Sequence, residues 1–110
     1  QAAEKVSSMM VDVVKNGFDK RASVEGYMIA GKTGTAQIAD GKGGYSDEFI
    51  HSFVGFAPAS DPKFLVLIRL EKPKGNRFAS NTLSAFFGEM MNYLLSYYEI
   101  PPDIRIESGI

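Results

Sequence analysis

The sequence predicts an α/β chain in which three antiparallel strands are flanked by two helices. Apolar residues recur at helical spacing near both ends of the chain. Between these ends lie three segments with strand-like patterns, separated by stretches rich in glycine, proline and aspartate. With 45% hydrophobic and 23% charged residues over 110 positions, the composition is that of a folded protein and limits it to one domain or part of one.

The first helix is predicted from Ala2 to Asn16. Its apolar residues fall on a single stripe of a helix, which consists of Val6, Met9, Met10, Val13 and Val14. Gly17 follows, at the position where a left-handed residue commonly terminates a helix. A short polar stretch, residues 19–25, leads into the first strand.

The three strands are predicted at residues 27–38, 50–56 and 64–70. A long mobile loop is expected over residues 39–47, because three glycines and two aspartates favour turns over a ladder. Pro58-Ala59-Ser60-Asp61-Pro62 is turn chemistry, so the second and third strands form an antiparallel hairpin. Since the third strand is apolar almost throughout, we expect both of its faces to be covered.

The second helix follows a loop over residues 71–77. Its apolar stripe comprises Leu83, Phe86, Phe87, Met90, Met91, Leu94, Leu95 and Tyr98. Ser80 or Asn81 is predicted to cap its start, and Pro101-Pro102 to stop it. The part of this stripe over residues 83–91 is interpreted as core packing and not as a ligand pocket.

Composition excludes several classes of function. The formal net charge of −1 gives no bulk positive field, so no nucleic acid partner is expected. Without cysteine and with a single histidine, the chain offers no disulfide, thiolate site or histidine metal cluster, and no metal or organic cofactor is implied. His51 itself is interpreted as a non-catalytic strand residue.

The segment GYMIAGKTGTAQ, residues 26–37, matches two catalytic signatures that exclude each other. From Gly26 to Thr33 it reads G-x-x-x-x-G-K-T, the phosphate loop of nucleotide hydrolases. Such a loop curls round a phosphate and then enters a helix. Here the variable positions are bulky strand formers and no helix is predicted to begin at Lys32, so a P-loop nucleotide hydrolase is the less favoured alternative.

The second signature is K-T-G-T, Lys32 to Thr35, which requires a strand at the edge of a cleft. Period two then places Lys32 and Gly34 on one face and Thr33 and Thr35 on the other. The Lys32 ammonium would attract an anion, and the threonine hydroxyls could donate to a carboxylate. Gly34 would permit close packing, and the Thr35 N–H could serve as an oxyanion donor.

The surroundings of this motif resemble a known family. AGKTGTAQ, a glycine-rich loop, IHSFVGFAPASDPKFLVLIRLEKP and a helix ending YLLSYYEIPPD occur in the order found at the end of class B penicillin-binding proteins. The resemblance extends from the first helix to about Asp103. It implies a penicillin-binding/β-lactamase-like serine transpeptidase fold. The implied activity is peptidoglycan D,D-transpeptidation through a serine acyl-enzyme.

The resemblance also implies site roles and partners. Lys32, Thr33, Gly34 and Thr35 would form the substrate-binding strand, with Lys32 shaping the field round the nucleophile and the Thr35 N–H forming half of the oxyanion hole. The implied ligands are peptidoglycan stem peptides and β-lactams. The parent protein would be anchored at the extracytoplasmic face of the bacterial cytoplasmic membrane by a segment that this chain does not contain.

Two further motifs of the family are missing from these 110 residues. The only S-x-x-K match is Ser60-Asp61-Pro62-Lys63, which falls in a turn and not at a helix start, and no S-x-N occurs. We therefore expect residues 1–110 to be the C-terminal segment of a transpeptidase domain, incomplete on its own. The N-terminal part, on another chain or supplied by domain exchange, would cover the excess apolar surface. A non-catalytic penicillin- or peptide-binding or sensor module with the same fold remains the alternative.

Overall fold

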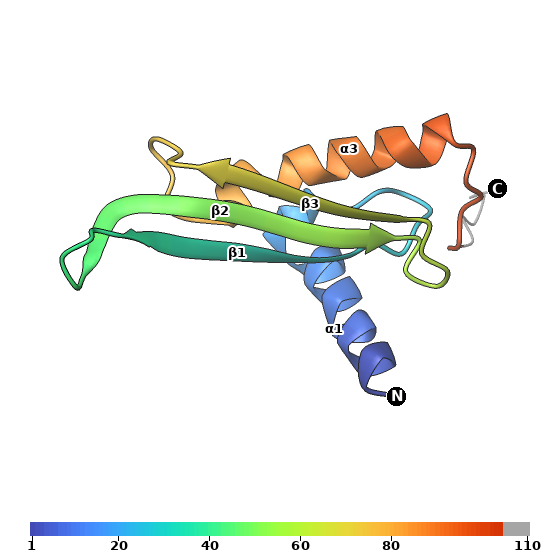
Figure 1. Cartoon of the computed structure of the whole chain (residues 1–110). Coiled ribbons are helices and arrows are strands. Elements are labelled where there is room, and N and C mark those ends of the chain that lie inside the picture. Colours follow the sequence, from blue (N-terminus) through green and yellow to red (C-terminus); the bar gives the residue numbers. More distant parts are fainter. Residues whose placement is uncertain (105–110) are drawn as a thin grey trace.

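The computed structural model describes residues 1–104, and its longest strand, β2 (Tyr45–Ala57), lies at the centre of a three-stranded antiparallel sheet (Figure 1). β1 (Ala30–Ala39) and β3 (Phe64–Glu71) flank it. In the register, Lys32 of β1 lies opposite Val54, which in turn lies opposite Leu67 of β3. The predicted order of helix, three strands and helix is confirmed, as is the hairpin of the second and third strands.

The first strand begins later than the sequence indicates. It was expected from residue 27 but starts at Ala30, because the preceding residues bond to the C-terminal segment and not to the ladder. The Met28 N–H donates to Asp103 Oδ1 at 2.7 Å, and the Tyr27 hydroxyl donates to the Ile100 carbonyl. These contacts connect the start of the sheet to residues 100–103.

The loop expected over residues 39–47 is a short turn, so β2 already begins at Tyr45. The Asp40 carboxylate accepts hydrogen bonds from two backbone N–H groups of the turn, at 2.7 and 3.1 Å. Gly41 and Gly43 have φ of +78° and +87°, which glycine adopts without strain. The prediction of a long loop was wrong because these glycines close the hairpin tightly.

Four helical segments accompany the sheet: α1 (Ala2–Asn16), the 3₁₀ turn η1 (Phe18–Lys20), α2 (Ala79–Thr82) and α3 (Ser84–Tyr97). In Figure 1, α3 runs along the sheet, whereas α1 crosses the strands and its N-terminal half projects away from them. Within residues 1–104, no helix combines the length and apolar character needed to cross a membrane.

The bounds of α1 agree with the prediction, but the way it ends does not. Gly17 has a φ of −108°, so its backbone is not left-handed. A side chain at this position would collide with the Val13 carbonyl oxygen, which accepts the Gly17 N–H at 2.8 Å. Gly17 is therefore needed because the backbone passes close to Val13 here, and not because the chain makes a left-handed turn.

The predicted start of the second helix was also wrong. Ser80 and Asn81 lie inside the short helix α2, and neither caps α3, whose N-cap residue is Leu83 with no side-chain cap. The chain leaves the helical path between α2 and α3, so the apolar pattern that predicted a single helix spans two helices. α3 ends at Tyr97, before Pro101 is reached.

The core lies between one face of the sheet and the helices. The rings of Phe53 on β2 and Phe87 on α3 stack with centroids 4.3 Å apart, and Phe18 meets Phe53 edge-on at 5.5 Å. The buried cluster comprises Val14, Ala22, Val24, Ile29, Phe53, Ala57, Leu83, Phe87, Met91 and Leu95. The interpretation of the second apolar stripe as core packing is confirmed for its buried members.

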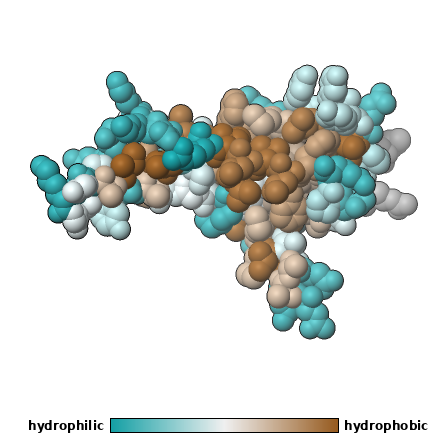
Figure 2. All heavy atoms as spheres, in the orientation of Figure 1, coloured by the Kyte–Doolittle hydropathy of each residue, from teal (hydrophilic) through white to brown (hydrophobic). Residues whose placement is uncertain are grey.

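The opposite face of the sheet is open, which contradicts the expectation that β3 is covered on both sides. Val66 and Ile68 pack against the core, but Leu65 and Leu67 are 73% and 68% exposed. Because side chains alternate between the two faces of a strand, these two pairs lie on opposite faces of the sheet. Within residues 1–104, helices cover only one of these faces. In Figure 2, hydrophobic residues gather over the part of the molecule where β2 and β3 run.

Gly55 provides a test of the close fit between α3 and the sheet. A Cβ at Gly55 would collide with the Phe87 ring and lie 2.6 Å from the Ala30 carbonyl oxygen. We expect Gly55→Ala to lower the free energy of unfolding of the whole protein by about 1–3 kcal/mol, because an overpacked core cannot relax there. Chemical denaturation measures this.

Gly44→Ala is the matched control for Gly55→Ala. A Cβ at Gly44 would meet only the Asp40 carboxylate, at 3.2 Å, in an exposed turn. Its effect should stay within about 0.5 kcal/mol. Equal losses in the two variants would contradict this account of Gly55.

Candidate functional site

The K-T-G-T residues lie in the middle of β1, which pairs with β2 on one side only in the described sheet. The strand continues to Ala39 and turns back into β2, so no helix follows Lys32. A phosphate loop needs a helix whose first N–H groups face the anion. The structure therefore contradicts the nucleotide hydrolase alternative.

The two faces of β1 are occupied as period two predicts. On the open face, a Cβ at Gly34 would lie 2.6 Å from Ser52 Oγ, so the glycine leaves room for the serine opposite it. On the helix-covered face, Thr35 Oγ1 accepts a hydrogen bond from the Ala79 N–H at 3.0 Å. The group close to Gly34 is thus the Ser52 side chain of the paired strand, and not a further element packed against β1 as expected.

The backbone of Thr35 faces the free edge of β1. The Phe49 carbonyl accepts from the Lys72 N–H at 2.8 Å on the β3 side, so alternate residues of β2, including His51, turn their backbone groups toward β3. Thr35 is the ladder partner of His51, and therefore has no backbone bond to β2. The N–H groups of Thr35 and Thr33 therefore both point away from β2, at the free edge of the sheet.

The Lys32 side chain bends round this same edge. Its Nζ donates to the Thr33 carbonyl at 3.0 Å and lies 3.4 Å from Thr33 Oγ1. No carboxylate in the described part of the chain forms an ion pair with it. An ammonium, a hydroxyl and outward-pointing N–H groups therefore converge at one edge, which suits an anion.

Thr35 has a second role that its motif does not indicate. Its hydroxyl oxygen receives the N–H of Ala79, the first residue of α2, which has no partner within that helix. With an oxygen lone pair engaged in this way, the hydroxyl proton of Thr35 remains available to an outside acceptor. No pattern in the sequence indicates this contact, because Ala79 contributes only its backbone N–H.

His51 is fully buried and both of its ring nitrogens have partners. Nδ1 lies 2.8 Å from Thr82 Oγ1, and Nε2 lies 2.9 Å from the Arg77 carbonyl oxygen. A side chain enclosed in this way does not reach solvent or substrate. This agrees with its interpretation as a non-catalytic strand histidine, although Thr82 as its partner was not predicted.

The S-x-x-K match lies in the turn between β2 and β3. Ser60 Oγ donates to Asp103 at 2.7 Å, and Lys63 pairs with Asp61 at 2.8 Å. Serine and lysine are thus bonded to different acids and do not share a helical turn. The rejection of Ser60 as a nucleophile agrees with this geometry.

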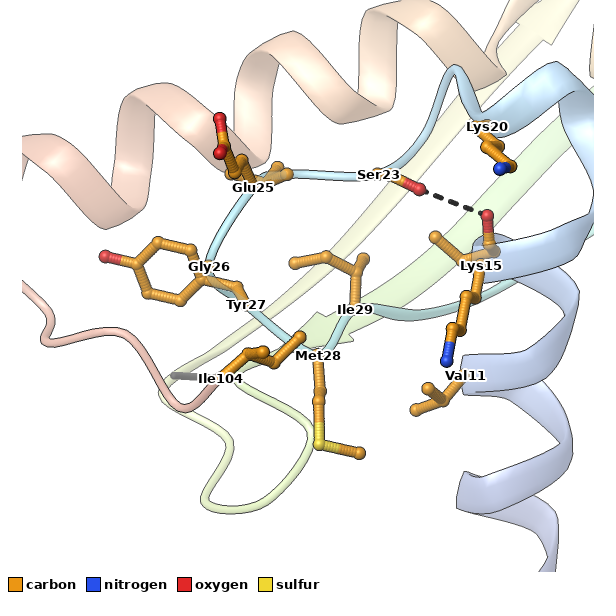
Figure 3. A pocket seen from close by; sticks show the side chains of 12 residues that line it. Val11, Lys15, Lys20, Ser23, Glu25, Gly26, Tyr27, Met28, Ile29 and Ile104 are labelled. Carbon is orange, nitrogen blue, oxygen red and sulfur yellow. Dashed lines mark hydrogen bonds between the residues drawn. The ribbon is translucent and has the colours of Figure 1, made fainter. Parts of the chain in front are cut away.

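A cavity of about 570 Å³ lies elsewhere, between α1 and residues 23–29 (Figure 3). Ser23 Oγ donates to the Val14 carbonyl at its upper rim, and Ile104 reaches its opposite side. None of Lys32 to Thr35 lines it, so it is separate from the site. Among residues 1–104, no three acidic, histidine or cysteine side chains cluster as a metal site would require.

Comparison with known sequences identifies relatives over most of the chain. Residues 1–92 match the family model of the penicillin binding protein transpeptidase domain. Peptidoglycan D,D-transpeptidase FtsI of Buchnera aphidicola is 37% identical over 89% of the chain, and stage V sporulation protein D of Bacillus subtilis is 36% identical over 93%. The chain spans only 17% and 16% of the lengths of these relatives.

Solved structures show the same similarity. Penicillin-binding protein 3 of Mycobacterium tuberculosis, complexed with ampicillin, superposes with a TM-score of 0.80 and 30% identity over 98% of the chain. The transpeptidase domain of Burkholderia pseudomallei penicillin-binding protein 3 gives 0.75 and 30% over 90%. The chain covers 26% and 30% of these two structures.

The contact of Thr35 with α2 predicts an effect on stability that is independent of catalysis. Thr35→Val leaves the N–H of buried Ala79 without its partner, so we expect the free energy of unfolding to fall by about 0.5–2 kcal/mol, as when a helix cap is lost. Thr35→Ser keeps the hydroxyl and should retain most of this stability. Denaturant titration of the whole protein measures both, and equal losses would contradict the assignment.

Proposed function

Because the chain belongs to the penicillin-binding protein transpeptidase family, we propose that it forms the K-T-G-T wall of the active site of a peptidoglycan D,D-transpeptidase. It contributes Lys32, Thr33, Gly34 and Thr35, whereas the nucleophilic serine belongs to the rest of the domain. The observation that carries the proposal is the convergence of the Lys32 ammonium and outward-facing donors at the free edge of β1.

The substrate group that fits this edge is the terminal carboxylate of a D-Ala-D-Ala stem peptide, or the equivalent carboxylate of a β-lactam. Lys32 supplies the opposite charge, and the hydroxyls of Thr33 and Thr35 donate hydrogen bonds. Gly34 and the adjacent Ser52 hydroxyl leave the strand without a bulky side chain at its centre. A ligand can therefore lie along β1.

In the proposed reaction the serine oxygen attacks the penultimate D-alanine carbonyl. The peptide bond to the terminal D-alanine breaks, and that residue leaves as the free amino acid, its amine having taken up the proton that the serine hydroxyl lost. An amine from a neighbouring stem peptide then takes the acyl group, and the proton that it loses returns to the serine oxygen. The Thr35 N–H is one donor to the oxyanion formed in both steps, and the charge of Lys32 favours ionisation of nearby hydroxyls.

The open face of the sheet is proposed to receive the remaining N-terminal part of the domain. Leu65 and Leu67 are largely exposed there, and β3 pairs with β2 alone in the described sheet. Val6 and Met9, on the projecting half of α1, expose apolar surface away from this face. A long apolar edge strand beside an apolar face is typical of a surface that another part of the protein covers.

The proposed substrate also sets the location of the protein. Peptidoglycan lies outside the cytoplasm, so we propose that the whole protein acts at the extracytoplasmic face of the bacterial cytoplasmic membrane. The relatives named as peptidoglycan D,D-transpeptidases support this proposal.

Acylation by penicillin tests the proposed function. The whole protein incubated with benzylpenicillin should gain the mass of the drug in intact-mass spectrometry. Lys32→Ala should lower the second-order rate constant of acylation about 100-fold, since it removes the positive charge at the carboxylate site. Lys42→Ala, in the exposed turn between β1 and β2, is the matched control and should leave the rate unchanged. If the folded wild-type protein is not acylated, the hypothesis of a non-catalytic binding or sensor module is favoured instead.

The proposed docking face predicts a stability difference between two exposed positions. Leu67→Ser should lower the unfolding free energy of the whole protein by about 1.5–3 kcal/mol, because Leu67 would be buried against the rest of the domain. Lys74→Ser, in the loop after β3, should change it by less than about 0.5 kcal/mol. If the Leu67 substitution were equally harmless, this face would be solvent-exposed in the whole protein.

A further inference from the structure

We propose that His51 and Thr82 are positioning residues that hold the Thr35 hydroxyl in the orientation that binds the substrate carboxylate. The proposal rests on the function proposed above. Neither residue belongs to the K-T-G-T motif, and each acts through the backbone of residues 77–82. The connection runs from β2, through the segment that contains α2, back to β1.

The His51 side chain is placed to hold residues 77–82 in position. It is the ladder partner of Thr35, and its buried ring lies under the chain that leads into α2. Because the Arg77 carbonyl can only accept, Nε2 carries a proton and donates it there at 2.9 Å. Nδ1 is then an acceptor, and the Thr82 hydroxyl donates to it at 2.8 Å. The imidazole therefore bonds to both ends of residues 77–82.

Ala79 lies between these two attachment points. Its N–H donates to Thr35 Oγ1 at 3.0 Å, and its carbonyl lies 3.2 Å from Thr82 Oγ1. α2 is only four residues long, so its own hydrogen bonds cannot hold it rigid. The direction of the Ala79 N–H thus depends on the two contacts of His51.

The orientation of the Thr35 hydroxyl follows from that direction. While the Ala79 N–H occupies the oxygen, the hydroxyl proton points elsewhere and can be donated to an anion at the free edge. When Ala79 shifts, the hydroxyl loses this constraint and can turn toward other acceptors. His51 itself remains too deeply buried to meet the ligand. Its effect on the reaction is therefore transmitted and not direct.

The experiment compares acylation of the whole protein by benzylpenicillin and by its methyl ester, which lacks the carboxylate charge. Thr82→Val keeps the shape of the side chain and removes the hydroxyl. We expect it to lower the second-order rate constant about tenfold for benzylpenicillin, the effect of weakening one hydrogen bond to a charged group, and less than twofold for the ester. Thr82→Ser retains the hydroxyl and should stay within twofold of wild type for both.

A double-mutant cycle with Thr35→Val separates positioning from general damage. If Thr82 acts through the Thr35 hydroxyl, Thr82→Val should have no further effect on benzylpenicillin acylation in the Thr35→Val background. Equal losses in both backgrounds, or equal losses for the acid and the ester, would overturn the proposal. Thermal unfolding shows whether each variant is folded.

A second variant covers the case in which Thr82→Val does not fold. His51→Gln takes its place in the same cycle, since it removes the ring that bridges Arg77 and Thr82 and keeps a polar side chain. The same tenfold loss, confined to the carboxylate ligand and absent in the Thr35→Val background, is expected. A wild-type protein that is folded but not acylated contradicts the proposed function itself, whereas an acylated wild type with additive variants contradicts only this inference.

Discussion

The close approach of α3 to the sheet at Gly55 is the constraint on which the rest of the structure depends. Only the absence of a side chain there lets Phe87 enter and stack on Phe53, the most deeply buried ring pair in the core. Gly31 likewise leaves room for neighbouring side chains, since a Cβ on it would lie 2.7 Å from Phe53 and 3.1 Å from Val14. α1 and α3 are thereby held on one face, and α2 is brought over Thr35 at the end of the K-T-G-T motif.

This one-sided arrangement explains why the motif can be both held in place and accessible. β1 is fixed by β2 along one edge and by α2 at Thr35, yet its other edge has no partner in the described sheet. Backbone donors in a fully paired strand would be consumed by the ladder. The proposed site at Lys32 to Thr35 therefore requires an edge strand that is supported from one side only, and His51 is proposed to belong to that support.

Sequence reasoning succeeded where the chemistry is local and periodic. The bounds of α1, the order of the elements, the hairpin and the alternation of Gly34 and Thr35 all follow from patterns that neighbouring residues impose. It failed at some local points, such as the tight turn over residues 40–44, and also where distant segments decide. β1 starts at Ala30 because residues 27–28 bond to residues 100–103. The apolar pattern of a single helix also conceals the break between α2 and α3.

The sequence by itself determined the family, the motif and the two faces of β1, because residue identity and period two are properties of the chain alone. Only the tertiary structure decided which backbone N–H groups face outward, and that the Thr35 hydroxyl receives the N–H of Ala79, 44 positions away. It also revealed that one face of β3 is open within residues 1–104. These features depend on which surfaces meet, and an apolar pattern states only that a surface needs to be covered.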